Sequence, residues 1–138
     1  MLEIKIPAHT DRLGEVLAFV GAAMRGTGID MKQENNINIA VEEVFVNIAH
    51  YAYPSGEGDV TVSLPVTPGS FVIEFRDSGL PYDPLSRCDP DITLSAAERE
   101  IGGLGIFMVK QLMDSVSYRY ENECNVLTIS KELTYESD

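Results

Sequence analysis

Residue types that build zinc sites are scarce in this sequence. The 138-residue chain contains two cysteines and two histidines. Cys88 and Cys124 are far apart and form no CxxC pair, and His9 and His50 are not spaced as metal ligands. We therefore expect no zinc site.

Long hydrophobic runs are absent as well. The sequence has no stretch of about 18 apolar residues that would span a bilayer. Its first residues, MLEIKIPAHTD, lack the basic and then apolar pattern of a signal peptide. The expectation is a cytoplasmic protein that does not enter the membrane.

Basic residues are few. Ten Lys and Arg stand against 22 Asp and Glu, which gives a formal net charge of -12. This field repels nucleic acid and anionic membranes, so we expect neither as a partner, although acidity that keeps a protein in solution explains most of the excess. A bound nucleotide would need basic groups, backbone amides and a metal ion gathered at one place, which implies Mg²⁺.

The composition that remains is that of an ordinary globular protein. Apolar residues make up 44% of the chain, and its length is close to the commonest size of one domain. We expect a single domain over residues 1–138.

The N-terminal half predicts one strand and two helices. Residues 2–7 alternate apolar and polar side chains as a strand does, and Thr10 or Asp11 is expected to cap the helix that follows. A second helix is expected from about Met31 to Tyr53, before Pro54. Its apolar face consists of Ile37, Val41, Val44, Phe45, Ile48 and Ala52, and the polar stripe beside it of Asn36, Glu43, Asn47 and His50.

The C-terminal half predicts a sheet interrupted by a long loop. Residues 59–66 and 70–77 read as a hairpin, and residues 115–120 and 125–133 as two closing strands. Between them, residues 77–103 form a stretch expected to be a mobile functional loop, before a helix over 105–113 with Leu104, Met108, Val109 and Leu112 facing inward. We expect an α+β fold, a two-layer sandwich of a mixed, mainly antiparallel sheet covered on one face by about three helices.

Polar residues on the second helix suggest a ligand site. Glu43 and Asn47 are four residues apart, so they stand on the same helix face and can share a ligand. Glu42 points about 100° away from Glu43 and should face outward. Taken alone, this pair is more often an ordinary solvated helix face.

Two further segments contain glycines next to groups that can bind a ligand. In DSGLPYDP, Asp77 ends a strand where its carboxylate can accept a hydrogen bond from a ligand, and Gly79 lets the backbone pass close to that ligand. In IGGLGIFMVK, backbone amides at Gly103, Leu104 and Gly105 can approach phosphate oxygens at a helix N-terminus. Each segment has a plainer alternative, a surface turn for the first and a sharp loop-to-helix connection for the second.

Taken together and in this order, the three segments resemble the superfamily of gyrase, heat-shock chaperones, histidine kinases and MutL, whose ATP-binding domain has the Bergerat fold. The pattern D-x-G-x-P-x-D-P is most similar to that of the stand-alone anti-sigma-factor serine/threonine kinases. The resemblance implies ATP and Mg²⁺ as cofactors, Asn47 as the metal ligand and Glu43 as the acceptor of the nucleophile's proton. It also implies that the Asp77 carboxylate accepts the adenine amino proton and that Gly79 lies close to the base.

The resemblance also implies roles for two residues outside these segments. Arg99, in a lid loop, would neutralise charge on the transferred phosphate, and Thr128 would reach the adenine through water. The alternatives are a solvated arginine paired with a neighbouring glutamate and an ordinary strand threonine. One departure is Tyr51, where many relatives have histidine, with His50 one position earlier.

The implied function is phosphorylation of a small anti-sigma-factor antagonist by a homodimeric protein kinase that, by analogy, also sequesters a sigma factor. The competing hypothesis is a non-catalytic, ATP-gated protein-binding module of the same fold. A detached histidine-kinase domain has less support, because no helix pair with a phospho-accepting histidine is present.

Overall fold

The computed structural model describes residues 2–54, 57–81, 83–86 and 103–133. The strands are β1 (Leu2–Pro7), β2 (Asp59–Leu64), β3 (Ser70–Asp77), β4 (Ser115–Glu121) and β5 (Cys124–Glu132). The helices are α1 (Leu13–Arg25), α2 (Met31–Tyr51) and α3 (Gly103–Leu112), with short 3-10 turns η1 (Thr10–Arg12) and η2 (Pro84–Ser86). None of the helices described is long and apolar enough to cross a membrane.

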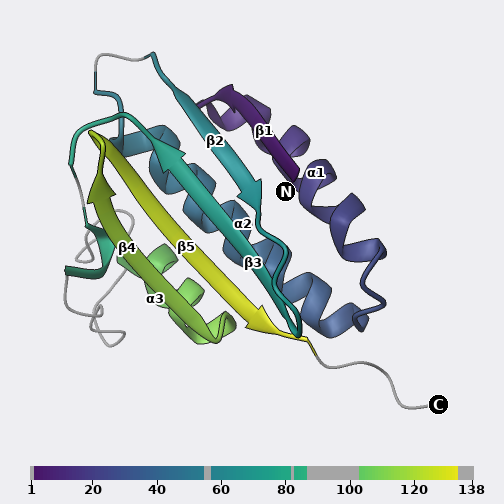
Figure 1. Cartoon of the computed structure of the whole chain (residues 1–138). Coiled ribbons are helices and arrows are strands. Elements are labelled where there is room, and N and C mark those ends of the chain that lie inside the picture. The colour runs from purple at the N-terminus through teal and green to yellow at the C-terminus, as the bar shows by residue number, and fades with distance from the viewer. Residues whose placement is uncertain (1, 55–56, 82, 87–102, 134–138) are drawn as a thin grey trace.

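The strands form one five-stranded sheet in the order β1-β2-β3-β5-β4. Helices α1, α2 and α3 lie behind this sheet on one face, and no described helix covers the other, bare face (Figure 1). The predicted α+β two-layer sandwich is therefore confirmed. The sheet was expected to be mixed, but each of its four described pairings is antiparallel.

The pairing of β3 with β5 places the residues that matter most for a site. These strands run side by side over their whole length, although α3 and β4 lie between them in the sequence. At one end of the pair Asp77 is opposite Asn125, and Asp77 is also opposite Val60 on β2. Since cross-strand partners point to the same face, Asp77 and Asn125 share a face of the sheet.

The hydrophobic core lies between the sheet and the helices, and α2 supplies most of its helical side. All six apolar positions predicted on this helix are buried, which confirms the phase of its 3.6-residue period. Asp30 caps the helix, because its side chain accepts a hydrogen bond from the backbone N–H of Gln33 at 2.8 Å. The fully buried core residues include Val16, Val20, Ile37, Val41, Val44, Phe45, Val60, Val62, Ile73, Phe75, Val109 and Ile129.

Two local predictions were wrong. Neither Thr10 nor Asp11 caps α1, because these residues form the 3-10 turn η1 and the helix begins at Leu13 without a side-chain cap. Helix α3 begins at Gly103 instead of Gly105. Its buried residues are Ile106 and Val109, and Met113 just after the helix is buried too. Val109 thus faces inward as expected, whereas Met108 and Leu112 are only partly covered, and the side chain of Leu104 lies outside what the structure describes.

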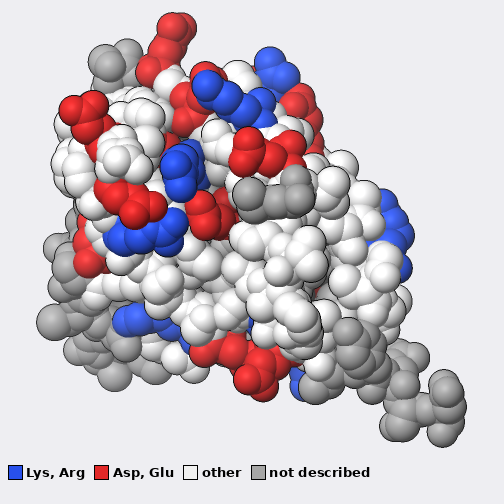
Figure 2. All heavy atoms as spheres, viewed as in Figure 1, with Lys and Arg blue, Asp and Glu red and all other residues white. Residues whose placement is uncertain are grey.

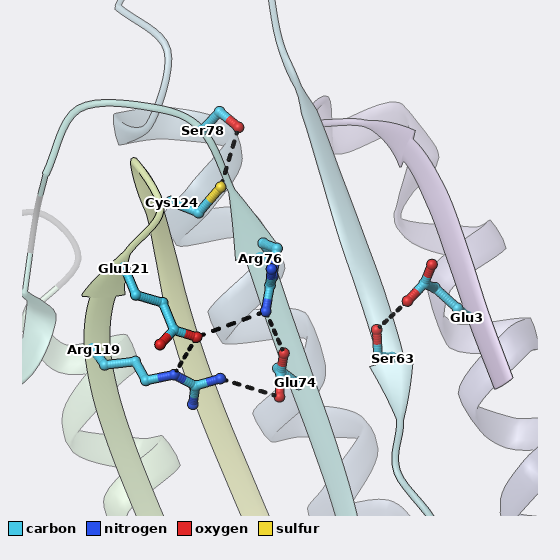
Figure 3. Close-up of polar contacts among 8 residues, drawn as sticks. All are labelled: Glu3, Ser63, Glu74, Arg76, Ser78, Arg119, Glu121 and Cys124. Atoms are coloured by element: carbon cyan, nitrogen blue, oxygen red, sulfur yellow. Dashed lines mark hydrogen bonds and ion pairs between the residues drawn. The ribbon is translucent and has the colours of Figure 1, made fainter. Parts of the chain in front are cut away.

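Charged side chains cover part of the bare sheet face (Figure 3). Arg119 Nε donates to Glu121 at 2.8 Å, Arg76 pairs with Glu74 at 3.3 Å, and longer contacts of 3.9 Å and 3.8 Å close the ring. On the molecular surface, seen from the side shown in Figure 1, most basic side chains lie beside acidic ones (Figure 2). This ring links β3 to β4 across β5 on the face opposite the helices.

Candidate functional site

The polar stripe of α2 runs along the edge of the core. Glu43 and Asn47 are half-buried, while Glu42 and His50 are exposed. Glu42 therefore faces outward as predicted, and Glu43 is the carboxylate that faces a neighbouring element.

Beyond Asn47, the C-terminal part of α2 forms one wall of a pocket. The pocket contains about 370 Å³ of space between atoms, part of which is open to solvent. Side chains from α2, from the end of β3, from η2 and from strands β4 and β5 enclose it. They are Asn47, Ile48, Tyr51, Ala52, Asp77, Leu80, Pro84, Tyr118, Asn125 and Leu127.

Asp77 is the acidic group of this pocket. Its side chain is 5% exposed, and Oδ1 accepts hydrogen bonds from the Gly79 N–H at 2.9 Å and from Asn125 Nδ2 at 3.0 Å. Burial raises the pKa of Asp77 above its ordinary value, and the two donated hydrogen bonds oppose this rise. Because Oδ1 is occupied, Oδ2 is the oxygen without a protein donor among the residues described.

Gly79 follows Asp77 and packs directly on the end of α2. A Cβ atom at this position would lie 2.1 Å from the Ala52 carbonyl oxygen, which leaves no room for a side chain. The next residue, Leu80, donates its N–H to the same oxygen at 2.9 Å. The structure therefore explains this glycine by contact with α2, a reason that differs from the predicted approach to the base.

Asn125 is a pocket residue that the sequence reasoning missed. It is 6% exposed, and its Nδ2 donates to Asp77 and to the Leu80 carbonyl oxygen at 2.8 Å. Its Oδ1 accepts from the Tyr118 hydroxyl, and Tyr118 also lines the pocket. An asparagine between Cys124 and Val126 is a weak signal of a site, and it becomes informative only when its register opposite Asp77 is known.

Thr128 is the predicted site residue that needs correction. It pairs with Glu74 on β3 and Ser117 on β4, and it therefore points to the bare face of the sheet where the charged ring lies (Figure 3). The pocket side of β5 is formed by Asn125 and Leu127. Thr128 is three residues from Asn125, an odd number, so the two side chains point to opposite faces of the strand.

Asn47 has the chemistry of a cation ligand. Its Oδ1 is buried and has no hydrogen-bond partner among the described residues. A buried carbonyl oxygen without a donor is costly unless a ligand satisfies it, and amide oxygens are suitable ligands for Mg²⁺. In the part of the chain that the structure describes, no three His, Cys, Asp or Glu side chains gather around a possible metal position. The donor set thus fits a metal ion that also takes oxygens from a phosphate.

Glu43 lies one helical turn from Asn47 and contacts the start of α3. A Cβ atom built on Gly105 would come within 2.5 Å of Glu43 Oε2, so the carboxylate fills the space that this glycine leaves. Burial, followed by repulsion from Glu42, raises the pKa of Glu43. Such a carboxylate can hold a proton at a higher pH than an exposed glutamate.

The first three residues of α3 are Gly103, Leu104 and Gly105. Amides in the first turn of a helix have no intrahelical acceptor, and they face the positive end of the helix dipole. The three predicted phosphate-binding positions thus coincide with the N-terminal turn of α3, beside Glu43. Arg99 lies outside the described residues.

The pocket that contains Asp77 and the carboxylate of Glu43 lie at opposite ends of the C-terminal half of α2. The enclosed pocket with Asp77 reaches Ala52, and the carboxylate of Glu43 lies beside α3. Nine residues separate Glu43 from Ala52, which corresponds to about 14 Å along the helix axis. Asn47 lies between them. Along this line lie an acceptor in an apolar pocket, then an amide oxygen, then a carboxylate beside a helix N-terminus. Such an order suits an elongated ligand with a base at one end and phosphates at the other.

Comparison with known sequences identifies a family. Residues 6–131 match the family model of the histidine kinase-like ATPase domain. The serine-protein kinase RsbW of Bacillus cereus (strain AH187) is 27% identical over 131 residues, which cover 91% of this chain and 81% of that protein. RsbW of Listeria monocytogenes serovar 1/2a (strain ATCC BAA-679 / EGD-e) is 28% identical over 133 residues, with coverages of 91% and 83%.

Solved structures share the fold. The structure of the RsbU and RsbW domains of Rv1364c from Mycobacterium tuberculosis matches 99% of this chain with a TM-score of 0.66 and 15% identity. This chain spans about a third of that protein's length, 34%. The histidine kinase AdeS of Acinetobacter baumannii matches 97% of this chain, and 70% of its own, with a TM-score of 0.50 and 10% identity. Since the family model covers most of the sequence, this chain belongs to the histidine kinase-like ATPase domain family.

Proposed function

We propose that this protein is an ATP-dependent serine/threonine protein kinase of the anti-sigma regulatory type. The observation that carries the proposal is the arrangement of three polar side chains: Asp77 in the pocket at the end of β3, Asn47 on the α2 wall of that pocket, and Glu43 one turn earlier on α2, beside the N-terminal turn of α3. The similarity to proteins named serine-protein kinase RsbW supports the same activity. Residues 1–138 then form one ATP-binding kinase domain.

In this proposal, the adenine base enters the enclosed pocket. Oδ2 of Asp77 accepts a hydrogen bond from the amino group of the base, while the apolar side chains of Ile48, Leu80 and Leu127 cover its faces. A hydrogen bond to a charged acceptor is worth about 1.5–3 kcal/mol, so this contact contributes strongly to affinity.

The phosphates extend toward α3. Backbone amides at Gly103, Leu104 and Gly105 donate to phosphate oxygens, and the Asn47 amide oxygen holds a Mg²⁺ ion. A Mg²⁺ ion held there together with ATP would supply positive charge that offsets the charge developing on the transferred phosphate. Arg99 would add a positive charge from the segment between η2 and α3.

Glu43 is the residue that favours a kinase over a passive ATP-binding module. Its carboxylate lies beside the amides proposed to hold the phosphates, where its negative charge repels ATP. A residue that weakens ATP binding in this way is expected there only if it has a catalytic role. A raised pKa brings its proton affinity closer to that needed by a general base near neutral pH. We assign Glu43 as the acceptor of the proton from the substrate hydroxyl.

The proposed protein substrate is a small anti-sigma-factor antagonist, and a sigma factor is proposed as a second partner. We further propose that the kinase is a cytoplasmic homodimer. These assignments rest on the similarity to RsbW and on the net charge of -12, which disfavours direct binding to nucleic acid.

Calorimetric titration with a non-hydrolysable ATP analogue, followed by a phosphotransfer assay, tests the proposal. Asp77→Asn should weaken binding by about tenfold or more, from the loss of about 1.5 kcal/mol. Asn47→Ala should weaken it mainly when Mg²⁺ is present. With labelled ATP and a candidate antagonist, Glu43→Gln should abolish transfer while the matched exposed variant Glu42→Gln retains it.

The outcomes separate the two functions. Absence of binding in the wild type, with and without Mg²⁺, would refute the ATP-binding assignment. Binding that is normal in Asp77→Asn would remove Asp77 from the base pocket. Binding without transfer to any antagonist would favour the non-catalytic module.

A further inference from the structure

Asn125 joins two walls of the pocket. Its Nδ2 donates to Asp77 Oδ1 at 3.0 Å and to the Leu80 carbonyl oxygen at 2.8 Å. One amide group on β5 therefore fixes both the acidic side chain at the end of β3 and the backbone of the segment that follows it. Asn125 is 6% exposed, so these hydrogen bonds are shielded from competing water.

The orientation of the Asn125 amide is itself fixed. Its Oδ1 accepts a hydrogen bond from the hydroxyl of Tyr118 on the neighbouring strand β4. A rotation of the amide by half a turn would place Oδ1 against the Asp77 carboxylate and the Leu80 carbonyl, which are both acceptors. Tyr118 and the two acceptors thus require the same orientation, with the NH₂ group toward Asp77 and Leu80.

Leu80 is held at both of its backbone polar groups. Its N–H donates to the Ala52 carbonyl oxygen at 2.9 Å, and its own carbonyl accepts from Asn125. Its side chain nevertheless lines the pocket and is 57% exposed. An apolar side chain on an immobilised backbone at a pocket wall provides a surface against which a flat ring can pack.

We propose that Asn125 is a positioning residue that makes the pocket selective for a 6-amino purine over a 6-oxo purine. It occupies Asp77 Oδ1 with a donor, leaves Oδ2 to accept from the base, and holds Leu80 at the pocket wall. A 6-oxo group would present an acceptor to the Asp77 acceptor, and such a mismatched buried pair is disfavoured. This inference rests on the proposed function, and it assigns the base specificity of the same site.

Titration of the full chain with ATP and with inosine triphosphate, each with Mg²⁺, tests the inference. Wild type should bind ATP at least about tenfold more tightly than inosine triphosphate, which is the difference in affinity that one good hydrogen bond makes. Asn125→Leu should lose most of this preference because ATP affinity falls and inosine triphosphate affinity changes little. Tyr118→Phe should shift the ratio in the same direction. Tyr120→Phe, on the same strand at a side chain that is 45% exposed, is the matched control and should keep the wild-type ratio.

The ratio of the two affinities separates positioning from a purely structural role. If Asn125→Leu and Tyr118→Phe weaken both nucleotides equally, Asn125 does not set the base specificity and the inference is wrong, while the proposed function stands. If wild type binds neither nucleotide, the proposed function is refuted together with the inference. Thermal unfolding midpoints establish that the variants are folded, and if Asn125→Leu does not fold, Tyr118→Phe decides the question.

Discussion

Substitution of Gly79 by alanine gives a sharp test of how the pocket wall packs on α2. The added Cβ would lie 2.1 Å from the Ala52 carbonyl oxygen and 2.6 Å from its carbonyl carbon, far inside the closest approach of real Cβ atoms. The obstacle is backbone at the end of a helix, which cannot rotate away as a side chain can. Among described residues, the glycines with positive φ are Gly28 and Gly69, so the effect at Gly79 is steric and not conformational.

The expected destabilisation has two contributions. Overpacking costs about 1–3 kcal/mol, and moving the segment away from Ala52 breaks the hydrogen bond from the Leu80 N–H, which is worth about 0.5–1.5 kcal/mol. The sum is about 2–4 kcal/mol. With an m-value of about 2 kcal/mol/M, the midpoint of urea unfolding should fall by about 1–2 M.

Gly21→Ala is the matched control for this experiment. A Cβ on Gly21, within α1, would meet its nearest neighbour, Arg25 Nη1, at an ordinary 3.7 Å. Alanine also has a better helix propensity than glycine by about 1 kcal/mol, so this variant should be at least as stable as wild type. A Gly79→Ala protein with the midpoint of wild type would refute the reasoning, because the segment after β3 would then not be packed on Ala52.

Two further predictions concern the carboxylates of the site. Gly105→Ala should preserve the fold but lower the phosphotransfer rate by about 100-fold, because the added Cβ displaces the flexible Glu43 carboxylate and a misplacement of about 1 Å has effects of this size. Single-turnover kinetics measure the rate, and urea unfolding measures the stability of the fold. An unchanged rate would contradict the contact between Gly105 and Glu43. Burial raises the pKa of Asp77, so the stability due to this group is complete below its unfolded pKa of about 3.9 and is lost as pH rises through the folded pKa. Asp77→Asn should therefore gain stability relative to wild type as pH rises from about 4 to about 7, and parallel unfolding curves across this range would argue against an unfavourably buried carboxylate.

Local patterns predicted the elements better than they predicted the neighbours of each strand. The 3.6-residue period of α2 identified its buried face and the outward position of Glu42, because a long helix with two distinct faces leaves few alternatives. The β2–β3 hairpin followed from the turn residues between its strands. The motif residues Glu43, Asn47 and Asp77 all lie where such a site could use them.

The misplaced residue on β5 shows where sequence reasoning failed. Choosing between Asn125 and Thr128 requires the register of β5 against β3, and a shift by an odd number of residues turns every side chain to the other face. That register depends on a pairing between distant segments, which no local pattern reports. Likewise, Met108 and Leu112 of α3 were expected to face inward, whereas Ile106 and Val109 are the buried residues; a short helix that is apolar on several sides does not show from its sequence which face it buries.

The central place of β5 has a consequence for synthesis of the protein. Strand β5 pairs with β3 on one side and β4 on the other, and it is the last of the five strands to leave the ribosome. Until it forms, β3 remains an unpaired edge open to wrong association, and Asp77 lacks the amide that holds it. In a nascent or truncated chain that stops before Cys124, β4 would lack its partner strand as well, because its described pairing is with β5. Such a chain would lack the finished base pocket, so nucleotide binding would report on chains that include β5.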